Sequence, residues 1–396
     1  MEYEYCQIDP KTSSVEEIRA EIERLSVLAD FQKDLEQGIK VFINSVYGAC
    51  ASPYFVGYNI KVAEAITLQG QDMLSYATKI LNRYFRDFWH KDKALHEKMG
   101  ITEVIKVSTD VVKYGDTDSV YLAFEDVLLS CNYTDKNPNN NGANFILDLY
   151  EHRLNEYITK CYEKYAKDSN TENIQSLELE KISKSAIILK KKKYVLDVVW
   201  SEPGIWTESL SKIESKGVEI VQSSTPPFAR KYLKTLLVDL FREGKNLNML
   251  KFVKKLKSIK EEFKLSDIAE VSKSTSISNY GKFITQDQDV ISIAPKCPIH
   301  VRAAGCYNYT LNNSKWKGKY MLINSGDKVK WYYAKSDTPQ TNVFAYQPGN
   351  YPYEFAPDID WDLQFTKCII EPINRFIIVM GFGAIPSNLI IGRSLF

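Results

Sequence analysis

Two aspartates separated by a single residue are the feature of this 396-residue sequence that most directly indicates chemistry. Asp116 and Asp118 lie within the segment 114–121, which reads Tyr-Gly-Asp-Thr-Asp-Ser-Val-Tyr, between two runs of strand-forming residues. A hairpin turn there would hold two negative charges at an exposed tip. Because Mg²⁺ prefers carboxylate oxygens together with substrate phosphates, the pair predicts a magnesium site. Taken alone, two aspartates at this spacing more often form a solvated turn than a metal site.

The octapeptide resembles motif C of the family B DNA polymerases, and a second motif of that family precedes it. Residues 40–48 read Lys-Val-Phe-Ile-Asn-Ser-Val-Tyr-Gly and resemble motif B. At about 100° per residue, Lys40, Asn44 and Tyr47 lie within about 60° of one another on one helix face. The resemblance implies that these three residues bind the incoming nucleotide, with Lys40 at its triphosphate. It also implies that Asp116 and Asp118 are catalytic and bind metal.

Two further segments match the family in the expected order. Residues 177–181 read Leu-Glu-Leu-Glu-Lys, and the resemblance implies that Glu180 adds a third carboxylate to the metal site. Lys191, Lys192, Lys193 and Tyr194 resemble the element with which the family holds the primer–template backbone. Contacts to phosphates position a duplex without reading its sequence, as a polymerase requires.

The last third of the sequence resembles the thumb of the replicative polymerases of large tailed bacteriophages. The segments that carry this likeness are 216–226, which begins with Lys216, and 296–303, which contains His300 and Arg302. The resemblance implies that these three residues contact DNA. It also implies that the final Leu395-Phe396 dock on a sliding clamp, although a buried C-terminus is an equally good interpretation of this short apolar tail.

The elements that must position these residues predict an α+β fold. The resemblance implies an incomplete polymerase right hand: a distal fingers helix (1–52), an antiparallel-sheet palm with helices (53–218), and a mainly helical thumb with the C-terminal tail (219–396). Hydrophobic periodicity and a capping-box pattern at residues 13–17 predict a helix from about residue 15 to 46. Further helices are predicted near 61–88, 145–166, 228–242 and 249–263. Strands are predicted at 104–107, 111–114 and 119–124, with two more between 176 and 200 that are separated by a polar break at 181–185.

Composition sets broader limits. Fifty-one basic and fifty acidic residues give a net charge of +1, which argues against a uniformly basic nucleic-acid coat. Basic residues instead cluster at 190–193, 251–260 and 315–319. Seven scattered cysteines fit reduced thiols, and the acidic N-terminus does not fit a signal peptide, so we expect a cytoplasmic protein without a membrane segment.

The family's upstream motifs are not found in this sequence, and this observation shapes the functional hypothesis. There is no match to motif A, whose aspartate shares the two metal ions with motif C, nor to an exonuclease motif. We therefore interpret the chain as the C-terminal subunit of a split DNA polymerase. It would act on primer–template DNA and dNTPs with two Mg²⁺ ions, shared with a partner chain that supplies motif A and the exonuclease.

Three alternatives remain open. The chain could be an artificially cut piece of an intact enzyme. It could be a non-catalytic scaffold subunit that binds DNA and the clamp, although the presence of Lys40, Asp116 and Asp118 argues against this. A polymerase primed by a terminal protein is disfavoured only by the phage-type thumb segments.

Overall fold

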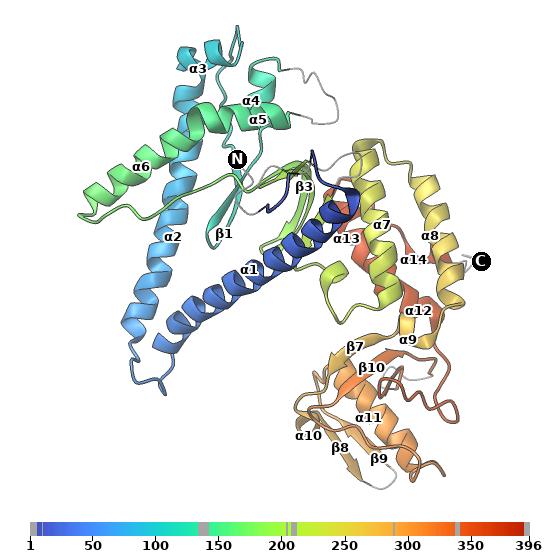
Figure 1. Cartoon of the computed structure of the whole chain (residues 1–396). Coiled ribbons are helices and arrows are strands. Elements are labelled where there is room, and N and C mark those ends of the chain that lie inside the picture. Colours follow the sequence, from blue (N-terminus) through green and yellow to red (C-terminus); the bar gives the residue numbers. More distant parts are fainter. Residues whose placement is uncertain are drawn as a thin grey trace. The chain divides into compact units, whose positions relative to one another are not determined.

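The computed structural model describes residues 6–9, 11–133, 142–202, 205–206, 212–287, 290–336 and 341–391. These form two compact units (Figure 1). Unit 1 comprises residues 1–96, 101–131 and 163–169, and unit 2 comprises residues 97–100, 132–162 and 170–396. Both contain helices together with small antiparallel sheets, so the predicted α+β class is confirmed.

Unit 1 begins with a long helix, α1 (Val15–Cys50). The predicted capping box is present, since the Glu17 backbone N–H donates to Ser14 Oγ at 3.3 Å and the Ser14 N–H donates to the Glu17 carboxylate at 2.8 Å. Most of this helix is solvent-exposed, including apolar side chains such as Ile22 (62%) and Phe42 (69%). Helix α1 therefore has an apolar surface that the described part of the chain does not cover.

Helix α2 (Ile60–Arg83) follows and diverges from α1 after the connecting segment 51–59 (Figure 1). It continues into a π-helical turn, η1 (Tyr84–Phe88), and a 3₁₀ turn, η2 (Trp89–Lys91). Its C-terminal half enters the core of unit 1, where Phe85 and Trp89 are fully buried. The Trp89 indole N–H donates to Ser130 Oγ at 2.9 Å, which ties this region to helix α4 (Glu125–Ser130).

The predicted strand at 104–107 is wrong. The structure assigns no strand to these described residues. Instead, the Ile105 N–H donates to the Ser130 carbonyl at 2.7 Å, so this backbone is tied to the end of a helix and lacks a strand partner. The two strands predicted around the aspartates are confirmed as β1 (Val112–Asp116) and β2 (Ser119–Leu122).

The main sheet of unit 2 is built around β4 (Lys193–Ser201). Strands β3 (Lys181–Lys190), β5 (Ile205–Trp206) and β6 (Lys212–Lys216) all pair with it in antiparallel orientation. The predicted polar break at 181–185 is wrong, because these residues lie within β3 and the turn is formed by residues 191–192. In β3 the buried Ile182 is followed by exposed polar residues, so the polar run marks a solvent-facing stretch of strand.

The helices of unit 2 correspond closely to the predicted ones. Residues 143–168 form α5 (Ala143–Leu149), η3 (Tyr150–Leu154) and α6 (Asn155–Asp168), whose last residues belong to unit 1. The next two helices are α7 (Pro227–Glu243) and α8 (Met249–Lys264). The shorter helical segments are α3 (Lys93–Lys98), η4 (Glu219–Val221), η5 (Gly244–Asn246), α9 (Ile268–Val271), α10 (Tyr280–Phe283), α12 (Trp361–Phe365), η6 (Thr366–Ile370), α13 (Glu371–Val379) and α14 (Ser387–Ile391).

Beyond α8, within the residues predicted to form a mainly helical thumb (219–396), the structure also contains strands and a packed core. Strands β7 (Lys273–Ser276), β10 (Lys328–Tyr333) and β11 (Val343–Tyr346) form a sheet in the order β11-β10-β7. A separate hairpin consists of β8 (Ile284–Asp287) and β9 (Val290–Ile293), and helix α11 (Ile299–Asn312) packs on β11. Aromatic rings fill the core: Tyr307, Tyr332, Phe344 and Phe365 are each at most 1% exposed.

A buried glutamine holds this core together through the backbone. Gln364 is fully buried; its Oε1 accepts from the Tyr333 N–H at 2.9 Å and its amide donates to the Val271 carbonyl at 2.6 Å. One side chain thus joins α12 to the edge of β10 and to α9. No helix among the described residues is long and apolar enough to cross a membrane.

Replacing Gln364 with alanine should lower the free energy of unfolding by about 2–4 kcal/mol, because two buried backbone groups lose their partners. Urea denaturation followed by circular dichroism measures this loss. The matched control is Gln347→Ala, at a partly exposed position where no side-chain hydrogen bond is found among the described residues. Equal, small losses in both variants would contradict the structural role assigned to Gln364.

Candidate functional site

The aspartate pair lies at the tip of the β1–β2 hairpin, as predicted. Opposite residues are Tyr114 with Tyr121 and Asp116 with Ser119, so Thr117 and Asp118 form the turn. Thr117 has a left-handed backbone (φ 58°), and the Asp118 N–H donates to the Asp116 carbonyl at 2.7 Å. The local sequence thus closes the hairpin with both carboxylates at one end.

The two carboxylates differ in exposure. Asp116 ends β1 and is half-buried, and one of its carboxylate oxygens accepts from the Thr117 hydroxyl at 3.2 Å, whereas Asp118 is exposed in the turn. Two carboxylates two residues apart form a donor set that fits Mg²⁺. No cluster of three or more potential metal-binding side chains is found among the described residues. The assignment of these aspartates to a metal site therefore stays a prediction.

Within unit 1, helix α2 packs against this hairpin and supports it. A Cβ atom at Gly115 would lie 3.4 Å from the Leu74 methyl groups, so the strand packs closely on the helix at this point. Asn82, also on α2, accepts from the Val112 N–H at 2.9 Å. The rings of Tyr114 and Tyr121 pack across the hairpin with their centroids 5.2 Å apart. These contacts fix the strand that ends in Asp116.

The predicted nucleotide-binding residues lie on the C-terminal part of α1. Lys40, Asn44 and Tyr47 share one helix face and are solvent-exposed, with Tyr47 39% exposed. They belong to unit 1, as do Asp116 and Asp118, whereas the third predicted carboxylate, Glu180, belongs to unit 2. Glu180 is exposed and immediately precedes β3. Its place at a shared metal site is thus a prediction that rests on the sequence motif.

The lysine run forms the turn of the β3–β4 hairpin in unit 2. Lys190 pairs with Lys193, and Lys192 has a left-handed backbone (φ 62°). Lys191 and Lys192 are exposed, whereas Tyr194 is only 3% exposed and packs inside the unit. The structure therefore presents the turn lysines to solvent. Tyr194 could contact DNA, as predicted, only after a conformational change that exposes its side chain.

Lys216 lies next to this turn, because it is paired with Tyr194 across β4 and β6. The following residue, Gly217, has a φ of +64°, and a Cβ atom there would lie 2.0 Å from the Lys192 carbonyl oxygen. Only glycine fits where two backbones approach this closely. Sequence reasoning identified Gly217 only as part of a motif; its proximity to the lysine turn was not predicted, since it depends on strand pairing.

The two remaining predicted DNA contacts lie at the start of α11. His300 and Arg302 are both half-buried, and an Arg302 guanidinium nitrogen donates to Asn342 Oδ1 at 3.2 Å. Burial lowers the pKa of His300 below its usual range, so the ring is neutral near pH 7. A neutral imidazole would contact a phosphate through a hydrogen bond only. The predicted clamp-binding residues, Leu395 and Phe396, lie outside the described residues.

Comparison with known proteins decides the family. The model of DNA polymerase family B matches residues 17–131 and 150–377. The chain belongs to DNA polymerase family B. The matched ranges include all the site residues named above apart from the C-terminal tail. They also include the β1–β2 and β3–β4 hairpins.

The chain is similar to family B relatives from two phages and from a herpesvirus. The chain is 26% identical over 353 residues to the DNA-directed DNA polymerase of Escherichia phage RB69, covering 85% of this chain and 36% of that protein. It is 25% identical to the enzyme of Enterobacteria phage T4 over 349 residues, covering 84% of this chain and 36% of the T4 protein. A DNA polymerase catalytic subunit of Psittacid herpesvirus 1 is 26% identical over 205 residues, 52% of this chain and 16% of that protein. The chain thus spans about a third of the length of its phage relatives.

Replacing Gly217 with alanine should lower the melting temperature by several degrees and the free energy of unfolding by about 2–4 kcal/mol. The new methyl group would meet the Lys192 carbonyl and would force the lysine turn away from β6. Circular dichroism during heating measures the change. Gly383→Ala is the control, because a Cβ atom there has open space. A Gly217→Ala variant as stable as this control would show that the close approach of the two backbones does not require glycine for stability.

Proposed function

We propose that this chain supplies the motif C half of a DNA-directed DNA polymerase active site. The observation that carries the proposal is the placement of Asp116 and Asp118 at the tip of one hairpin inside the region matched by the family model. The reaction is template-directed attack of a primer 3′-oxygen on the α-phosphorus of a dNTP, with pyrophosphate leaving. Phosphoryl transfer of this kind depends on positioning and on neutralising developing negative charge.

The proposed roles follow from residue chemistry. Asp116 and Asp118, with Glu180, would hold Mg²⁺; two such ions, when bound, would stabilise the attacking and leaving oxygens. Lys40 would bind the triphosphate, with Asn44 and Tyr47 on the same helix face. Lys191, Lys192 and the neighbouring Lys193, Tyr194 and Lys216 would bind the primer–template backbone, as would His300 and Arg302.

We further propose that a second polypeptide completes the active site by supplying motif A and the exonuclease. Support comes from α1, on which a row of exposed apolar side chains recurs every three or four residues: Leu35 is 48% exposed, Ile39 54% and Phe42 69%. A row of this spacing forms one continuous helix face. Large exposed apolar surfaces of this kind mark interaction sites. The exposed row therefore fits a further helical segment packed along α1.

Primer extension with Mg²⁺ and four dNTPs tests both proposals. The chain would be assayed alone and together with a polypeptide that carries the exonuclease and upstream palm of a phage-type family B polymerase from the same genome. Extension only in the mixture would support a divided active site. Extension by the chain alone would contradict it. DNA binding without extension in either case would favour the scaffold function over the catalytic one.

Replacing Asp118 with alanine should reduce incorporation by the assembled enzyme at least about a hundredfold while leaving DNA affinity nearly unchanged. A loss of several kcal/mol in charge stabilisation costs a factor of ten for each ~1.4 kcal/mol. Single-turnover incorporation and duplex binding are measured on the same preparation. Asp168→Ala, at an exposed position at the end of α6, is the control. Full incorporation by the Asp118→Ala enzyme would exclude the metal-site role.

Replacing Lys40 with alanine should raise the apparent KM for dNTP or lower kcat by about tenfold or more, since a charge-assisted contact to phosphate is lost. Duplex affinity should change less than about twofold. Lys33→Ala is a matched control, because Lys33 lies about two turns earlier on the same face of the same helix. An equal effect of both substitutions, or an equal loss of DNA affinity, would argue against a specific contact between Lys40 and the triphosphate.

A further inference from the structure

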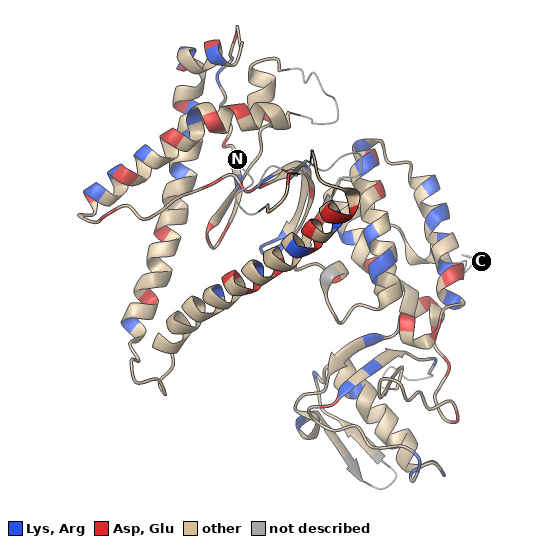
Figure 2. Cartoon of the chain, in the orientation of Figure 1, with Lys and Arg blue, Asp and Glu red and all other residues tan. Residues whose placement is uncertain are grey.

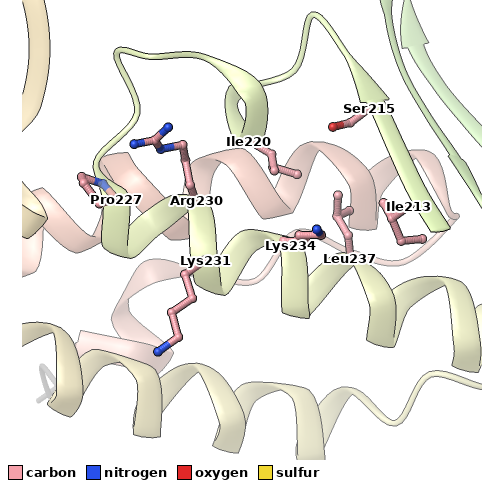
Figure 3. Close-up of a pocket in the computed structure, with 8 residues that line it drawn as sticks. All are labelled: Ile213, Ser215, Ile220, Pro227, Arg230, Lys231, Lys234 and Leu237. Atoms are coloured by element: carbon pink, nitrogen blue, oxygen red, sulfur yellow. The ribbon is translucent and has the colours of Figure 1, made fainter. Parts of the chain in front are cut away.

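A cavity of about 480 Å³ lies between β6 and the N-terminal half of α7, within unit 2. Figure 3 shows Ile213 and Ser215 of β6 on one side of it and Arg230 and Lys234 of α7 on the other. Its volume is within the usual range for small-ligand sites, about 300–1,000 Å³. None of the sequence motifs includes the two basic residues.

Arg230 and Lys234 are spaced by four residues and thus share one face of α7. Both are exposed, and neither forms an ion pair in the described part of the chain. Lys231 also lines the cavity, but Figure 3 shows it extending away from Ser215, and its ammonium lies 5.2 Å from the centre of the Tyr232 ring. The cavity wall therefore presents two cations that have no ion-pair partner among the described residues.

Two lysines on the neighbouring helix α8 differ in this respect. Figure 2 shows basic residues along both α7 and α8. On α8, Lys255 binds Asp239 at 2.5 Å, and the buried Lys260 binds Asp362 at 2.6 Å. These pairs stabilise the packing of helices. Within the described part of the chain, Arg230 and Lys234 have no ion-pair partner of this kind, so their positive potential is available to a ligand.

Two acids are adjacent in sequence to the lining residues: Glu214 on β6, which binds Lys181 at 2.7 Å, and Glu219, which belongs to the segment between β6 and α7. The Glu219 carboxylate oxygen Oε1 binds the Arg375 guanidinium and lies 3.9 Å from the Lys193 ammonium. Two cations thus share one carboxylate at this place. The surroundings of the cavity stay positive when Glu219 is counted.

The rest of the lining is apolar. Ile213, Ile220 and Leu237 form apolar walls, and Ser215 adds one hydroxyl group. Two cations beside apolar walls and a hydroxyl fit a phosphate followed by a sugar, because the phosphate binds the cations and the ring packs on the aliphatic groups. A bare inorganic anion would leave the apolar walls unused.

We propose that this cavity is a binding site for the phosphodiester backbone of a nucleic acid strand, with Arg230 and Lys234 as its phosphate ligands. The inference rests on the proposed function, in which unit 2 binds DNA. The ends of the segment 215–220 line the cavity, while Gly217 in its middle lies against the backbone of the lysine turn. A strand repeats its negative charges every few ångströms. It can therefore bind the turn lysines and the cavity together, as a single nucleotide cannot.

The test compares two double substitutions in the full chain. Arg230→Gln with Lys234→Gln removes the cavity cations, and Lys251→Gln with Lys254→Gln removes two exposed cations from α8. Fluorescence anisotropy of a labelled primer–template duplex gives the affinity at several NaCl concentrations. Each phosphate contact contributes about 0.9 to the slope of log K against log salt concentration. The cavity variant should lose about 1.8 from that slope and at least about tenfold in affinity at ~100 mM NaCl.

Each outcome has a definite meaning. The inference is upheld if the cavity variant shows this loss, keeps its melting temperature, and exceeds the control variant in its effect. It is overturned if both variants lose equally or if neither changes while the unsubstituted chain binds duplex; the proposed function then survives. It is also overturned if the cavity substitutions weaken binding of a free dNTP or of a poly-glutamate peptide but not of duplex. If the unsubstituted chain binds no duplex at all, the DNA-binding function itself fails.

Discussion

The pairing of β4 with its neighbours is the interaction on which the organisation of unit 2 depends. Val195 and Val198 on this strand are fully buried, and β3 and β6 bind its two edges through backbone hydrogen bonds. This pairing places the lysine turn at one end of the sheet and Lys216 beside it. The left-handed Gly217 then lets the chain pass against the Lys192 carbonyl. The positions of the turn lysines, Lys216 and the β6 side of the cavity follow from that register.

The lysines of unit 2 include some that pair with acids and some that are exposed to solvent. Lysines that join helices have acids within hydrogen-bonding distance, such as Lys260 with Asp362, and Lys260 is only 3% exposed. Lysines at the hairpin turn are exposed instead. A near-zero net charge therefore conceals local surfaces that differ strongly in potential. In the proposed function, which requires binding a polyanion without reading its sequence, this local distribution matters more than the sum.

Unit 1 joins two properties that belong together in the proposed function. The β1–β2 hairpin gathers two carboxylates on a support formed by α2, whose Asn82 and Leu74 hold the first strand. Helix α1 presents exposed polar residues on one face and a row of exposed apolar side chains elsewhere on its surface. A hairpin with two carboxylates at its tip, in the same unit as a helix with exposed apolar side chains, is consistent with the proposed active site that further polypeptide completes. The match to DNA polymerase family B extends over most of the chain and includes both of these elements.

Features that depend on short-range patterns could be predicted from the order of the amino acids alone. The capping box at Ser14, the helix that follows it and the turn between Asp116 and Asp118 need only neighbouring residues, and the structure agrees with all three predictions. Long-range packing decided the rest. The aromatic C-terminal region has no clear periodicity, yet it forms a core because rings distant in sequence meet there, as Tyr307 meets Phe344 at 5.7 Å. The polar residues at the start of β3 were wrongly predicted as a break between strands, because which face of a strand is exposed depends on the strand that pairs with it. The burial of Tyr194 and the cavity beside Arg230 likewise depend on strand pairing, which a single sequence does not contain.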